Sequence, residues 1–134
     1  MLRAALAASP QDAGLHHALG LTLVRLKRVD EELSELRRAV EIDPGQARYA
    51  YVYAVALNSA GRSSEAMTKL MANLARHPND RDTLLALISF SRDGGDAAGA
   101  LKYAEQLAQI SPQDRGLAAL IEELRRQAGK PNEK

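Results

Sequence analysis

The fold of this chain is decided by residues 13–44, which read AGLHHALGLTLVRLKRVDEELSELRRAVEIDP. In the first half of this stretch apolar residues recur at helical spacing, at Leu15, Leu19, Leu23 and Leu26. The second half repeats the pattern with Leu33, Leu36, Val40 and Ile42. Between the halves lies a short polar turn. The spacing therefore predicts two helices, 13–26 and 30–42, with Pro44 after the end of the second.

Prolines show that this helical pair is one unit of a repeat. Pro10, Pro44, Pro78 and Pro112 are each 34 residues apart. Six further columns align across three units: Leu19, Tyr53 and Leu87; Gly20, Ala54 and Ile88; Leu23, Leu57 and Ser91; Glu32, Ala66 and Ala100; Leu36, Leu70 and Ala104; and Ala39, Asn73 and Leu107. A fixed period of this length is typical of a stacked array, in which each unit buries the apolar face of its neighbour.

Local signals for helix ends follow the same period. Gly61 and Gly95 suit helix C-termini, and Asp12, Asp80 and Asp114 suit the N-caps of the helices that follow. One stretch disagrees, because residues 49–55 alternate large and small side chains as a strand would. We predict a helix there, since the stretch occupies the slot of a helix in the flanking units and is rich in alanine.

This combination of period, small residues, apolar columns and closing prolines resembles the tetratricopeptide repeat family. The resemblance implies an all-α fold, a right-handed α-solenoid of stacked antiparallel helix pairs forming a superhelix. It divides a single domain, 1–128, into a partial repeat (1–12), three full repeats (13–46, 47–80 and 81–114) and a capping helix (115–128), followed by a polar tail (129–134). The nearest rival is the RNA-binding pentatricopeptide repeat, which the unbroken period of 34 and the net charge of +1 disfavour.

Glu32 departs from the family pattern. It stands in the column that places Ala66 and Ala100 between paired helices, and Gly20 faces this column. We expect the absent side chain of Gly20 to leave room for the stem of Glu32. The carboxylate then has to reach solvent or a partner, because an unpaired buried charge is costly. The simpler interpretation, which we favour, is a tolerated, tilted helix edge.

Composition excludes several classes of protein. The chain has 134 residues, 46% hydrophobic and 26% charged, so it is neither disordered nor a membrane span. The charge of +1 argues against binding nucleic acid, and the absence of cysteine excludes disulfides and thiolate chemistry. The polar residues that begin at Ser9 interrupt the N-terminal apolar stretch too early for a signal peptide. We expect a soluble protein, cytoplasmic or periplasmic in a bacterium, with no direct membrane insertion.

In the family, the first helix of each unit lines a concave groove. Carried over by column, the groove residues are His17, Leu21, Arg25, Arg48, Tyr51, Val55, Asn58, Leu85, Ser89 and Arg92. The resemblance thus implies a non-catalytic scaffold that binds a peptide or partner helix with apolar anchors and some acid. Tyr51 is the strongest single candidate, although an ordinary solvated helix face is an equal interpretation of any one residue. Two alternatives remain, a self-association module and an accessory domain of a larger enzyme or membrane-linked protein.

Signals for an enzyme or a metal site are weak. His16 and His17 are adjacent on a helix and therefore point about 100° apart, which does not suit one metal ion. We expect His16 to pack between helices. The glycine-rich residues 94–99 lack the lysine and hydroxyl of a phosphate-binding loop and follow a helix, not a strand. We expect no enzyme activity, no cofactor and no metal.

The N-terminal segment is predicted to be the second helix of a cut-off repeat. Leu2, Ala5 and Leu6 recur at helical spacing and can contact the helix over 13–26. A helix this short depends on that contact to form. Its other side is left uncovered, which predicts either further repeats upstream or a homodimer through this edge.

Overall fold

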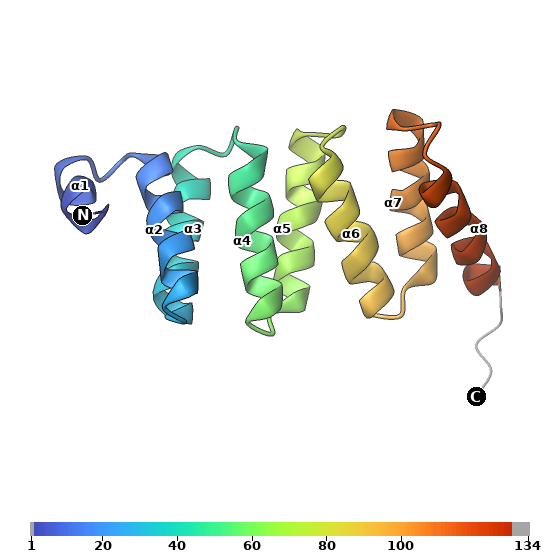
Figure 1. Ribbon diagram of the computed structural model, residues 1–134, viewed down its shortest axis with the longest axis horizontal. Coiled ribbons are helices and arrows are strands. Elements are labelled where there is room, and N and C mark those ends of the chain that lie inside the picture. The colour runs from blue at the N-terminus through green and yellow to red at the C-terminus, as the bar shows by residue number, and fades with distance from the viewer. Residues whose placement is uncertain (1, 130–134) are drawn as a thin grey trace. The chain divides into compact units, whose positions relative to one another are not determined.

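The computed structural model describes residues 2–129, which form eight α-helices and no strand (Figure 1). The helices are α1 (Leu2–Ala8), α2 (Ala13–Arg25), α3 (Val29–Ile42), α4 (Ala47–Ser59), α5 (Ser63–Arg76), α6 (Arg81–Asp93), α7 (Ala97–Ile110) and α8 (Arg115–Gly129). The stretch with strand-like alternation lies within α4, so the prediction of a helix there is confirmed. Residues 130–134, including Pro131 and most of the expected polar tail, lie outside the described part, as does residue 1.

The chain divides into two compact units at the boundary between Arg76 and His77. In the first unit, α2 pairs with α3 and α4 with α5, while α3 packs on α4 and α1 on α2. In the second unit, α6 pairs with α7, and α8 packs on α7. These pairs are the helical hairpins that the sequence pattern predicts.

The aligned columns form the core of both units. All eighteen residues of the six columns are buried, although the columns include polar side chains such as Glu32, Asn73 and Ser91. Leu36, Leu70 and Ala104, which share one column, have no exposed surface at all. The period therefore marks burial as well as helix position, because each unit places the same slots at equivalent interfaces.

Helix ends follow the predicted signals. The backbone N–H of Leu15 donates to the Asp12 carboxylate (3.1 Å), and that of Leu117 donates to the Asp114 carboxylate (3.0 Å). Asp80 caps α6 in the same way. Each repeat prolyl residue lies two positions after the end of α1, α3, α5 or α7. The backbone conformation repeats with the same period. Positive φ angles occur at Lys27, Gly61 and Gly95, which are again 34 residues apart.

The first and last helices are held by apolar contacts, as predicted. Leu6 of α1 packs with Leu19 and Leu23 of α2, and Leu2 joins this cluster. At the other end, Leu117, Ile121 and Leu124 of α8 are buried on the side toward α7. Within the described residues no helix combines the length and apolar character that a membrane span requires.

Candidate functional site

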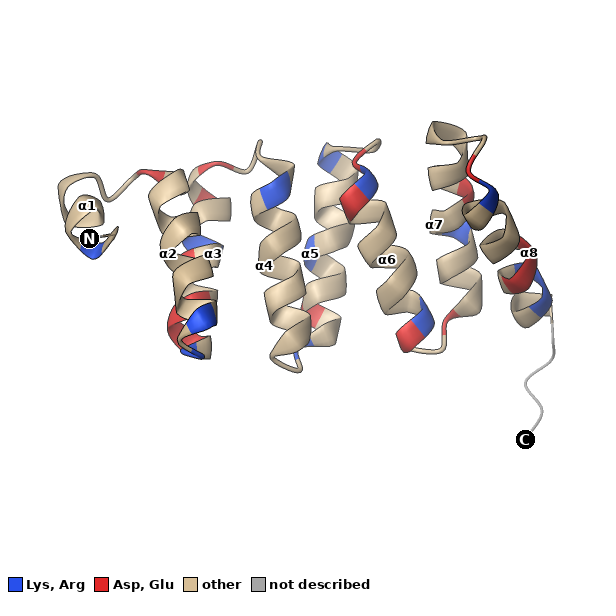
Figure 2. Ribbon diagram, viewed as in Figure 1, with Lys and Arg blue, Asp and Glu red and all other residues tan. Residues whose placement is uncertain are grey.

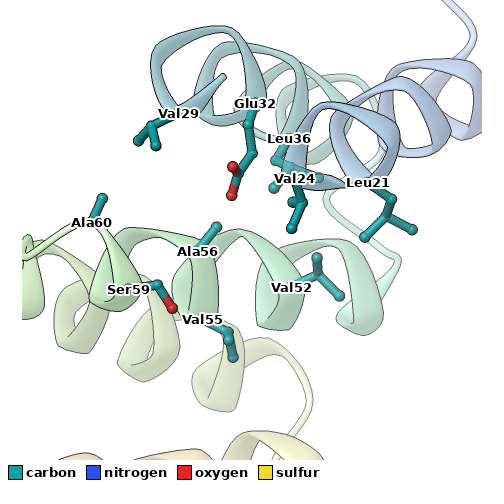
Figure 3. Close-up of a pocket in the computed structure, with 10 residues that line it drawn as sticks. All are labelled: Leu21, Val24, Val29, Glu32, Leu36, Val52, Val55, Ala56, Ser59 and Ala60. Atoms are coloured by element: carbon teal, nitrogen blue, oxygen red, sulfur yellow. The ribbon is translucent and has the colours of Figure 1, made fainter. Parts of the chain in front are cut away.

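A hollow of about 320 Å³ opens in the first unit between α2, α3 and α4. Its size is at the lower end of the roughly 300–1,000 Å³ that small-ligand sites occupy. We call it the Glu32 pocket, defined by its lining residues Leu21, Val24, Val29, Glu32, Leu36, Val52, Val55, Ala56, Ser59 and Ala60 (Figure 3). Most of these side chains are aliphatic, and Glu32 is the one charged group among them.

The pocket lies along the later turns of α2 and α4. Near the start of the two helices, the rings of His17 and Tyr49 are in contact, with centroids 4.7 Å apart. Further along, the pocket is lined by Ala56 of α4 and by Ala60, directly after the helix, which are too small to fill the space. The floor is then supplied by α3, through Glu32 and Leu36. The pocket therefore exists where one interface between neighbouring helical pairs is incompletely packed.

Glu32 is the unusual member of this site. Only 8% of its surface is exposed, and its carboxylate makes no ion pair or hydrogen bond with any residue of the described range 2–129. Figure 3 shows this carboxylate directed from α3 toward α4, into the pocket. Burial raises the pKa of Glu32 above its ordinary value. The hydroxyl of Ser59 is the other polar side chain of the lining.

Two expectations about Glu32 are corrected by the structure. The space that Gly20 leaves is occupied by Leu36, since a Cβ on Gly20 would lie 2.6 Å from the Leu36 Cδ2 atom. The interpretation of a tolerated, tilted helix edge is also wrong, because Glu32 is buried and faces the pocket. Leu36 thus fills the contact with Gly20, whereas Glu32, one turn earlier on the same face of α3, lines the pocket between α2, α3 and α4.

The predicted groove residues of the first unit are divided between exposed and half-buried positions. Leu21, Arg25 and Arg48 are exposed, whereas His17, Tyr51, Val55 and Asn58 are half-buried. The structure brings Leu21 and Val55 together in the Glu32 pocket, and Tyr51 is not part of its lining. Arg48 is the one charged residue of α4 (Figure 2). Burial, together with the positive charge of Arg48, lowers the pKa of His17.

In the second unit, the predicted groove residues share one face of α6. Leu85, Ser89 and Arg92 follow each other at helical spacing, and all three are exposed. Leu85 is the large apolar member, with 47% of its surface exposed. Neither Arg92 here nor Arg25 and Arg48 in the first unit makes an ion pair with another described residue.

Sequence reasoning placed the site on the first helices alone and missed the contribution of α3. Val29, Glu32 and Leu36 of α3 form part of the pocket. The signal was present, since Glu32 stands in a column of alanines. It could not be interpreted as a pocket residue without knowing which way the side chain points.

The remaining polar candidates have structural roles. His16 is buried, and its ring nitrogens face the Glu35 carboxylate (2.5 Å) and the Pro10 carbonyl oxygen (2.8 Å). It thus packs between helices, as expected. Residues 94–96 join α6 to α7, and residues 97–99 form the first turn of α7, where the Gly99 N–H donates to the carboxylate of the N-cap residue Asp96 (2.9 Å). Among the residues that the structure describes, no group of three or more potential ligand side chains could hold a metal ion.

Comparison with known proteins agrees with this architecture. Residues 26–90 match the family model of the tetratricopeptide repeat. No curated protein matches the chain in sequence. The crystal structure of MamA protein superposes with a TM-score of 0.79 at 19% identity, over 96% of this chain and 70% of that one. A structure of MamA AMB-1 gives a TM-score of 0.70 at 24% identity, over 90% and 66% of the two chains. At such identities the likeness concerns the fold.

Proposed function

Because this chain contains tetratricopeptide repeats in an α-solenoid, we propose that it is a non-catalytic scaffold that binds a peptide or helix of a partner protein. One observation carries the proposal. Three of the six large apolar side chains that are exposed in the described range, Leu21, Val24 and Val29, line the Glu32 pocket together. Apolar residues gathered in this way on a surface mark interaction sites, because water is displaced favourably when a partner covers them.

Within each unit, the binding residues we propose lie on the first helix of each helical pair. In the first unit it includes the stripe of Arg48, Tyr51, Val55 and Asn58 on α4, which are spaced three and four residues apart. His17, Leu21 and Arg25 form the equivalent stripe on α2. In the second unit, Leu85, Ser89 and Arg92 supply it on α6. Tyrosine and arginine are enriched at interfaces, and the arginines favour a partner with acidic residues.

The test is affinity capture with the wild-type chain and with a double variant, Tyr51→Ala with Arg48→Glu. We expect the variant to lose the proteins that the wild type retains, while its circular dichroism stays helical, because neither side chain belongs to the core. The matched control is Met71→Ala with Arg76→Glu, which makes the same kinds of change at exposed positions of α5. Retention of the same proteins by wild type and Tyr51 variant would refute the proposed surface.

The mass of the purified chain in solution distinguishes this proposal from self-association. Light scattering after size exclusion measures the mass of the particle directly. A value of 14.5 kDa supports a scaffold that meets other proteins as a monomer. A value twice as large, together with capture of no other protein, would favour the self-association module instead.

A further inference from the structure

From the Glu32 pocket we infer that this chain receives a single lysine side chain of its protein partner, with the methylene stem along the aliphatic walls and the ammonium group against the Glu32 carboxylate. This inference rests on the proposed function for the source of the lysine. It requires that the partner present a basic residue, in addition to the acidic residues that the exposed arginines favour.

The Glu32 carboxylate is buried without a partner in the described range. Glu32 is more than nine-tenths buried and has no partner among the described residues, and its oxygens face the pocket. A buried charge without a partner is destabilising, so a persistent unpaired carboxylate indicates a group that arrives from outside. The lining contains no lysine, arginine or histidine, so no residue of the pocket itself can supply the positive charge.

The repeat does not need a glutamate in this slot. The equivalent residues of the next two pairs, Ala66 and Ala100, are completely buried and complete their hairpins with a single methyl group. An alanine therefore satisfies the packing of this slot elsewhere in the same chain. In the first pair the glutamate instead gives the pocket an anionic end.

The shape and the other donors and acceptors favour lysine over arginine. Leu21, Val24 and Val55 provide apolar walls for a flexible aliphatic stem. The side-chain acceptors of the lining are the Glu32 carboxylate and the Ser59 hydroxyl. An ammonium group has three donors to satisfy, whereas a guanidinium has five in a rigid fork, and this lining would leave more of those unpaired.

The first experiment uses n-butylammonium, which reproduces the lysine side chain, with n-butanol as its uncharged match and n-propylguanidinium for arginine. Binding is followed by methyl NMR of Leu21, Val24, Val52 and Val55 in the intact chain. We expect n-butylammonium to bind about tenfold or more tightly than either of the other two, since a desolvated ion pair favours the ammonium. Equal binding of n-butanol would overturn the inference, and tighter binding of the guanidinium would overturn the assignment to lysine.

Variants then locate the effect. Glu32→Gln and Glu32→Ala should both reduce the affinity for n-butylammonium to that for n-butanol. Glu41→Gln, the same change at an exposed position of the same helix, should leave the preference intact. We expect the alanine variant to fold, because alanine occupies this slot in the next two pairs. A preference for the ammonium that survives in both Glu32 variants would overturn the inference.

The last measurement identifies the source of the lysine. A carbodiimide links a carboxylate directly to a neighbouring amine, so treatment of the captured complex should join Glu32 to a lysine of the partner. A link from Glu32 to a second copy of this chain would overturn the assignment to a different protein. Failure of capture would count against the proposed function alone, because the n-butylammonium measurement reads the pocket without any partner.

Discussion

Leu36 of α3 occupies the space that a side chain on Gly20 of α2 would need. A Cβ atom built on Gly20 would lie 2.6 Å from Cδ2 and 2.7 Å from Cγ of Leu36, which is closer than two carbon atoms can approach. Leu36 itself has no exposed surface. The close approach of α2 and α3 at this point therefore depends on glycine.

Gly20→Ala should lower the free energy of unfolding by about 1–3 kcal/mol, because the added methyl group forces Leu36 or the helices to move. Urea denaturation measures the change. The control is Gly116→Ala in α8, where a Cβ would meet only the Asp114 carboxylate at an ordinary contact distance of 3.4 Å. This substitution should be neutral or stabilising by up to about 1 kcal/mol, as for an exposed helical glycine. Equal stability of Gly20→Ala and wild type would contradict the packing described.

Lys27→Gly should stabilise the chain by about 0.5–1 kcal/mol. Lys27 has a φ of 57°, in the left-handed region. The residues one and two periods later have positive φ angles too, and both are glycines, Gly61 and Gly95. A side chain in this region is strained, and glycine is not. The control is Lys69→Gly within α5, which should destabilise by about 1 kcal/mol since a helix interior disfavours glycine. Thermal denaturation distinguishes the two directions, and a loss of stability in Lys27→Gly would count against the prediction.

Glu32 should make the stability of the chain depend on pH. Burial raises its pKa in the folded state, so the folded chain holds this proton more tightly than the unfolded chain. The resulting stabilisation is fully present below the unfolded pKa and is lost as the pH rises through the folded pKa. We expect the free energy of unfolding of wild type, relative to Glu32→Gln, to fall as the pH rises above the ordinary pKa of a glutamate, about 4.3. Subtracting the free energy of unfolding of the variant removes the contribution of the other carboxylates. A difference between wild type and variant that does not change with pH would refute the prediction.

Leu124→Ala should lower the free energy of unfolding by about 2–5 kcal/mol, because it leaves a cavity between α8 and α7. Leu124 has no exposed surface, although it lies close to the end of the described chain. The matched change Leu120→Ala affects a half-buried side chain of the same helix and should have a smaller effect. Similar losses in the two variants would mean that α8 covers the unit loosely, and equilibrium denaturation measures both.

The helices and the core could be predicted because their signals are local and repeated. The prolines, the caps at Asp12 and Asp114 and the six columns each recur at the same spacing, and every column residue is buried. Even the strand-like stretch within α4 was predicted as a helix from its slot in the repeat. Comparison between units corrects a misleading local pattern, because equivalent slots meet the same packing environment.

The pocket, in contrast, could not be predicted from the sequence, as Glu32 shows. Its column and its departure from alanine are visible in the sequence, but two interpretations were open, a stem in the space beside Gly20 and a tilted helix edge. The sequence by itself determined the period, the helices and the set of buried positions, since these follow from spacing along one chain. Only the tertiary structure decided that Leu36 takes the space beside Gly20 and that Glu32 faces a hollow beside α4. The physical reason is that the direction of a side chain at an interface depends on how closely neighbouring helices approach, and that distance is set by all of their side chains together.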